Sequence, residues 1–124
     1  MITFIYLLIS IFLATPIDAE PKVEWLGPTL HEFGDIYHNE PAVHKFEFRN
    51  VSNAPIVIDN ARPSCGCTIP KWSEEPVLPD SIGVLEVEYD ARDLGYFRKK
   101  VKVYFSGQRK AEVLFLEGWT VKLE

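Results

Sequence analysis

The chain has 124 residues, with 13 basic and 18 acidic side chains and a formal net charge of −5 at pH 7. This length accommodates one domain at most. The acidic balance makes nucleic acids and anionic lipid surfaces poor partners for the protein.

The first nineteen residues have the pattern of a secretory leader. An apolar run from Ile2 to Ala14 is followed by Pro16 and by a small residue, Ala19, at the expected cleavage point. The alternative is an uncleaved membrane anchor, but the run is shorter than the roughly 18–20 residues that a spanning helix needs. We therefore predict a signal peptide over residues 1–19 and a secreted or periplasmic protein. It would touch a membrane only through the leader, if the leader stays uncleaved.

Beyond the leader, residues 20–30 are expected to form an extended lead-in and residues 31–124 one domain. Its clearest strand covers 42–50, where His44, Phe46 and Phe48 alternate with charged residues. Alternation or turn signals place further strands at 30–33, 56–61, 82–90, 98–105 and 111–123, with a bulge or kink at Gly118.

No part of the mature chain has apolar residues at helical spacing, whereas β-branched and aromatic residues dominate the segments between turns. This pattern predicts an all-β fold, an immunoglobulin-like antiparallel β-sandwich of about seven strands with Greek-key connections. The acidic row 86, 88, 90 and the basic run 98–102 are expected to match across neighbouring strands.

The only two cysteines, Cys65 and Cys67, flank Gly66 near the middle of the chain. Side chains two residues apart on a strand point to the same face, and the glycine lets the backbone bend enough for the sulfurs to meet. Three states remain open, namely two buried thiols, a local disulfide, or a two-thiolate metal site. His44 is the best placed histidine to add a metal ligand, but a histidine on an apolar face is more often a packed core residue.

Several short segments occur in an order that characterises one family. They are Phe33-Gly34-Asp35, Phe46-Glu47-Phe48-Arg49-Asn50, Ser64-Cys65-Gly66-Cys67-Thr68, Pro79 with Gly83, Tyr89-Asp90 and Gly95-Tyr96-Phe97. Over residues 31–121 the chain resembles the bacterial domain-of-unknown-function family 1573, DUF1573. The resemblance implies secreted or lipid-anchored proteins with an immunoglobulin-like fold related to Hydin-type domains. Since no cysteine lies near Ala19, a lipid-modified N-terminal cysteine is excluded here.

Two turns depart from the family pattern. Val51-Ser52-Asn53 follows Asn50 where family members often have Asn-Thr-Gly, and Asp80 follows Pro79 where they often have Pro-Gly. Both departures concern turn geometry rather than the strands.

Nucleophile elbows, phosphate loops and dinucleotide fingerprints do not occur in the sequence. We therefore predict a non-enzymatic interaction or structural module of the cell envelope, without a cofactor, that binds protein partners of the envelope. The alternative hypothesis is a thiol redox or copper-binding protein that uses the Cys65-Gly66-Cys67 motif.

Overall fold

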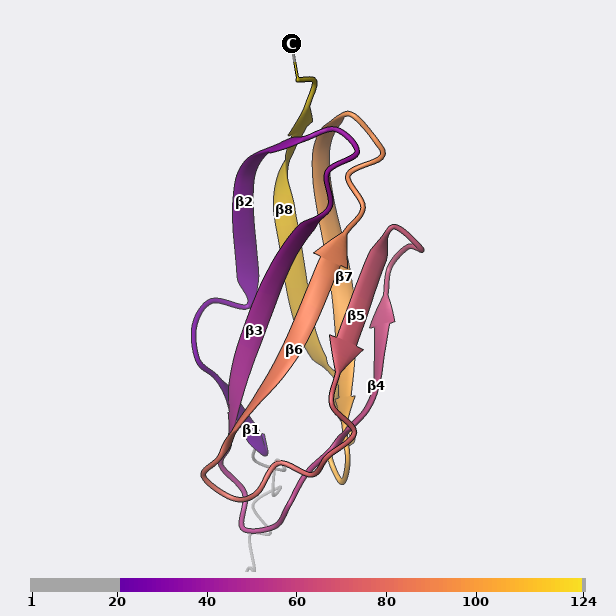
Figure 1. The fold of residues 1–124 in the computed structure, drawn as a ribbon. Helices are drawn as coiled ribbons and strands as arrows, with labels where there is room; N and C mark the ends of the chain where they lie inside the picture. Colours follow the sequence, from indigo (N-terminus) through magenta and orange to yellow (C-terminus); the bar gives the residue numbers. More distant parts are fainter. Residues whose placement is uncertain (1–20, 124) are drawn as a thin grey trace, which may run out of the picture.

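The computed structural model describes residues 21–123, which form eight strands and no helix (Figure 1). The strands are β1 (Val23–Trp25), β2 (Leu30–Tyr37), β3 (Ala42–Asn50), β4 (Ile58–Pro63), β5 (Thr68–Trp72), β6 (Ile82–Tyr89), β7 (Gly95–Phe105) and β8 (Glu112–Val121). The predicted signal peptide, residues 1–19, lies outside the described residues. Within those residues, no helix has the length and apolar character needed to cross a membrane.

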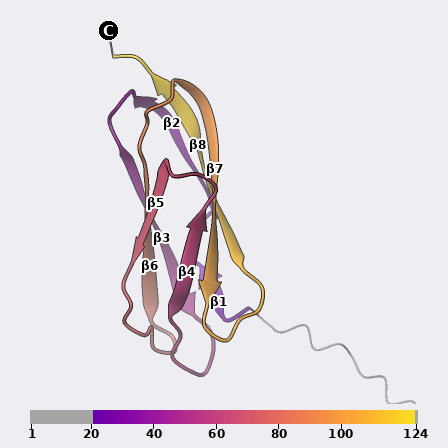
Figure 2. The same ribbon diagram turned by 90° about the vertical axis from the view of Figure 1, so that its right-hand side faces the viewer.

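Two four-stranded sheets pack face to face, with strand orders β1-β3-β6-β5 and β2-β8-β7-β4. If β1 and β2 are taken as one first strand divided between the sheets, the orders become ABED and AGFC. Apart from the A half in the second sheet, these are the ABED and CFG sheets of the immunoglobulin constant type. Figure 2 shows the edge of the sandwich where β4 and β5, one from each sheet, run next to each other. The predicted all-β, immunoglobulin-like sandwich is therefore confirmed.

The division of the first strand explains why one pair of strands is parallel. β1, inside the expected extended lead-in, pairs antiparallel with the end of β3. The chain then crosses to the other sheet, where β2 runs parallel to β8. The expectation of a purely antiparallel sandwich therefore misses this pair, because a three-residue strand and a change of sheet leave no alternation in the sequence.

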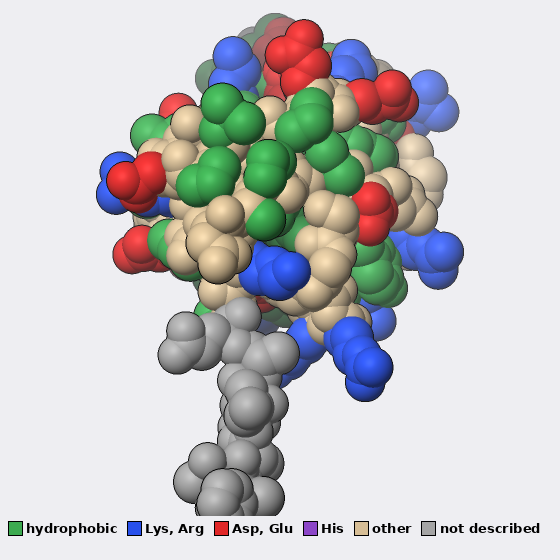
Figure 3. Space-filling model, turned by 90° about the horizontal axis from the view of Figure 1, so that it is seen from below, with side chains coloured by type: hydrophobic (Ala, Val, Ile, Leu, Met, Phe, Trp, Pro, Cys, Tyr) green, Lys and Arg blue, Asp and Glu red, His purple; other side chains and the backbone are tan. Residues whose placement is uncertain are grey.

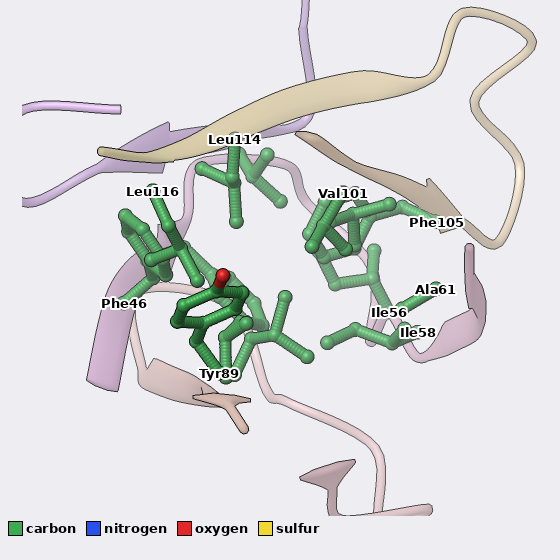
Figure 4. Close-up of a cluster of buried hydrophobic side chains, with 14 of the residues drawn as sticks. Phe46, Ile56, Ile58, Ala61, Tyr89, Val101, Phe105, Leu114 and Leu116 are labelled. Atoms are coloured by element: carbon green, nitrogen blue, oxygen red, sulfur yellow. The ribbon is translucent and has the colours of Figure 1, made fainter. Parts of the chain in front are cut away.

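Alternation along the strands produces the core between the sheets, because successive side chains point to opposite faces. Most inward residues of β3, β6 and β7 are buried, as the patterns in 42–50, 82–90 and 98–105 predicted, whereas His44 is only half-buried. Figure 4 shows part of this core, with Phe46, Tyr89, Leu114 and Leu116 toward the left of the view and Val101 and Phe105 toward the right.

The bulge expected at Gly118 belongs instead to the neighbouring strand. β8 pairs with β7 without a break in register, while the β2 ladder shifts between Glu32 and Asp35. That shift contains Gly34, at a φ of 69°. A Cβ on Gly118 would lie 2.7 Å from the Gly34 carbonyl oxygen and 2.9 Å from the Phe97 ring. Gly118 is thus required for close approach of the strands, not for a kink in its own strand.

Candidate functional site

Cys65 and Cys67 form a disulfide in the connection between β4 and β5, with their Cα atoms 5.3 Å apart. The Thr68 hydroxyl lies 3.8 Å from the Cys65 sulfur and 3.7 Å from the Cys67 sulfur. Of the three states left open by the sequence, the structure has the local disulfide. In this disulfide form neither sulfur is a thiolate that can hold copper.

His44, the third candidate ligand, lies on β3 and stacks against His31 of β2. The ring centroids are 3.6 Å apart and the rings are inclined by 9°. The pair joins the two sheets at the edge where β2 and β3 meet. Partial burial lowers the pKa of both imidazoles, and the charge of His31 lowers the pKa of His44 further.

The structure does not assemble the predicted metal ligands into one site. Among residues 21–123, no group of three or more His, Cys, Asp or Glu side chains is placed to hold an ion. His44 contacts His31 and the edge of Phe46. The geometry therefore lends no support to the thiol or copper hypothesis.

The expected match between the acidic and basic rows is wrong. The acidic strand β6 pairs with β3 and β5, whereas the basic strand β7 pairs with β4 and β8 in the other sheet. Glu86 instead lies between Lys45 and Lys71, its direct partners on either side. Strand order is set by contacts distant in the sequence, so charge patterns alone cannot reveal it.

A groove lies on the outer face of the β1-β3-β6-β5 sheet. It has a volume of about 820 Å³ and opens beside the loop that joins β5 and β6. Ile82 and Val84 lie along it, 51% and 40% exposed, and Leu78 of the loop is 58% exposed. Lys45 and Glu86 also line it. The groove therefore combines apolar surface with charged side chains of both signs.

The groove adjoins the end of the sandwich where several loops meet. In Figure 3, which views this end, hydrophobic side chains gather on the surface. Val51, Ala54 and Pro55 of the β3–β4 loop and Pro76, Leu78 and Pro79 of the β5–β6 loop are all exposed. This set of six residues is called the apolar loop end below.

Asn50 holds these two loops together from inside. Its side chain is fully buried, and its Nδ2 donates to the carbonyl oxygens of Ala54 at 2.8 Å and Val77 at 2.9 Å. Its Oδ1 accepts from the backbone N–H of Ser52 at 2.9 Å and from the Ser52 hydroxyl at 2.7 Å. The apolar loop end is therefore a preorganised surface.

The groove was not predicted from the sequence, and Asn50 was noted there only as the last residue of one family segment. Ile82 and Val84 are apolar although they point away from the core, on the same face of β6 as Glu86. Apolar residues at these outward positions are the sequence signal that could have indicated the groove. The β5–β6 loop, which contains Leu78, has no hydrophobic periodicity. Its position beside β3 depends on the hydrogen bond from Asn50 to the Val77 carbonyl, which residue types and spacing do not reveal.

The strand order and the divided first strand define an immunoglobulin-like β-sandwich, and solved structures share it. PapD-like domain 7 of human CEP192 superposes with a TM-score of 0.66 at 14% identity, covering 90% of this chain and 95% of that domain. WR4, a member of the MSP family from C. elegans, gives 0.54 at 7% identity, with 81% and 98% covered. The chain belongs to the DUF1573 family of proteins of unknown function, whose model matches residues 26–120.

A bacterial structure of unknown function gives a similar result. The protein from Porphyromonas gingivalis W83 has a TM-score of 0.66 at 14% identity, and 78% of this chain is covered. This chain spans only 46% of that protein's length. No curated protein matches the sequence at a significant level. At these identities the likeness concerns the fold alone.

Proposed function

We propose that this protein is a non-enzymatic binding module of the cell envelope, which engages a partner protein through the groove and the adjoining apolar loop end. The observation that carries the proposal is the open groove of about 820 Å³ with Ile82 and Leu78 more than half exposed. Contiguous apolar surface rimmed by charged groups is typical of protein interaction sites.

The fixed position of the loops strengthens this proposal. Asn50 joins both loops by buried hydrogen bonds, so a partner would not have to order them on binding. Preorganisation of this kind favours affinity by lowering the entropic cost of association. The location in the envelope follows from the leader predicted over residues 1–19, whose removal after Ala19 is part of the proposal.

Two leucines of similar exposure provide a matched test. Leu78 lies in the apolar loop end, and Leu94, 47% exposed, lies in the β6–β7 connection. Leu78→Ser and Leu94→Ser variants of the full chain would be expressed with the leader and cross-linked in intact cells. We expect a specific, saturable cross-link to an envelope protein that Leu78→Ser abolishes and Leu94→Ser preserves, and a mature N-terminus at Glu20. Equal cross-linking in both variants, or retention in the cytoplasm, would refute the proposal.

A further inference from the structure

The outer face of the other sheet carries a row of exposed cations. Arg98, Lys100 and Lys102 alternate along β7, and Arg62 of β4 is the direct cross-strand partner of Lys102. These four residues are called the basic face. Like charges directly opposite one another destabilise a sheet, so the Arg62–Lys102 pair works against folding.

The neighbouring strand β8 places one acidic residue opposite these cations, since Glu117 is the direct partner of Arg98. The β8 partners of Lys100 and Lys102 are Phe115 and Val113, which carry no charge. Within residues 21–123, the one ion pair closer than 4.0 Å joins Arg92 and Asp90 and involves none of the four cations. Arg62, Lys100 and Lys102 thus have no acidic cross-strand partner among residues 21–123.

The opposite sheet shows that this chain can pair its surface charges. There, Glu86 lies directly between Lys45 and Lys71 across three strands. Opposite charges in register stabilise a sheet modestly. Lys45 and Lys71 therefore have an acidic cross-strand partner, as Arg98 has, whereas Lys100 and Lys102 have none.

Aromatic side chains border the basic face. The guanidinium of Arg98 lies over the Phe115 ring at 4.8 Å from its centroid, and that of Arg62 lies over Tyr104 at 5.5 Å. Tyr96 of β7 and Trp119 of β8 are 50% and 54% exposed, and their ring centroids are 5.3 Å apart. Arginine, tyrosine and tryptophan are the residues most enriched where protein partners bind tightly.

We propose that the basic face binds an extended acidic segment of a partner protein. Same-face side chains along β7 repeat at about 6.6–6.8 Å, twice the rise of a strand residue. An extended polypeptide with a carboxylate at every second position has the same repeat, so two of its charges can match Lys100 and Lys102, which have no acidic cross-strand partner. This surface lies on the other side of the sandwich from the groove, so the inference goes beyond the proposed function.

The test uses the full chain and a short fluorescent peptide in which glutamate alternates with threonine. We expect binding that weakens with added salt and falls about tenfold in Lys100→Gln/Lys102→Gln, as loss of two charged contacts implies. The matched control is Lys45→Gln/Lys71→Gln, which removes the same charge from the other sheet and should leave the affinity within about twofold. Thermal melting establishes that both variants are folded.

Several results would overturn the inference. They are absence of binding, an equal loss in both double variants, and equal affinity for a peptide of the same composition with its glutamates contiguous. Tighter binding to polyguluronate or to phosphatidylglycerol vesicles than to the alternating peptide would assign the basic face to another class of ligand. Leu78→Ser should not change peptide binding, so failure here leaves the cross-linking test of the groove unaffected.

Discussion

Replacing Asn50 with alanine should destabilise the protein by far more than an ordinary polar substitution. Four hydrogen bonds to a fully buried side chain would disappear, two to the Ala54 and Val77 carbonyls and two from Ser52. A net contribution of about 1 kcal/mol for each bond, reduced where water reaches the freed groups, predicts a loss of about 3 kcal/mol in the free energy of unfolding.

Urea unfolding of the mature protein with its disulfide intact measures this loss as a lower midpoint at an unchanged slope. Asn53→Ala is the matched control, because Asn53 is exposed in the same loop, and it should change stability by less than about 0.5 kcal/mol. Asn50→Asp keeps the shape but puts an acceptor against the Ala54 and Val77 carbonyls, so it should cost at least as much as alanine. A loss below about 1 kcal/mol for Asn50→Ala, or one that Asn53→Ala reproduces, would show that the hydrogen bonds do not hold the loops.

Three further predictions concern other parts of the fold. Gly83→Ala should lower the free energy of unfolding by about 1–3 kcal/mol in urea titrations, because its Cβ would lie 2.3 Å from the buried Phe48 ring; unchanged stability would contradict this packing. Replacing both cysteines of the three-residue disulfide loop with serine should lower the free energy of unfolding by no more than about 1.5 kcal/mol, since so short a loop restricts the unfolded chain little. A larger decrease in the same assay would assign the disulfide a major structural role. Because the folded-state pKa values of His31 and His44 lie below the ordinary 6.5, the unfolded chain binds more protons, and stability falls as the pH drops below about 6.5. The melting temperature should therefore be lower at pH 5.5 than at pH 7.5, and the difference should be smaller in His31→Gln. An identical pH dependence in that variant would exclude the imidazole pair as the cause.

The parts of the fold that the sequence predicts are those with local signals. Phe46 and Phe48 alternate with charged residues, and the strand they define is β3 with the expected bounds. β1 has three residues and depends on β3 for its pairing, so it carries no period of its own. The partners of β6 and β7 also depend on distant segments. The two strands themselves are well predicted, but the expectation that they are neighbours in one sheet is wrong for this reason.

The same distinction applies to the candidate sites. The disulfide joins residues two positions apart and was among the states that the sequence left open. The stacking of His31 on His44 joins different sheets, and the groove joins β6 to a loop without a pattern. These features depend on tertiary structure, so residue types and spacing could not predict them.

Three residues of the segments that carry the family resemblance have structural roles in this chain, whereas Pro79 and Tyr96 of the same segments are exposed on the proposed surfaces. Asn50 ties two loops, Gly83 accommodates the Phe48 ring, and Gly34 forms the bulge of β2. None of these side chains is available to a partner, because Asn50 is buried and a glycine presents only backbone. The groove residue Leu78 and the basic residue Lys100 lie outside those segments, where substitution leaves the core untouched. Proteins that share the segments can therefore share the sandwich while differing in what they bind, and partner specificity should be sought at these exposed positions.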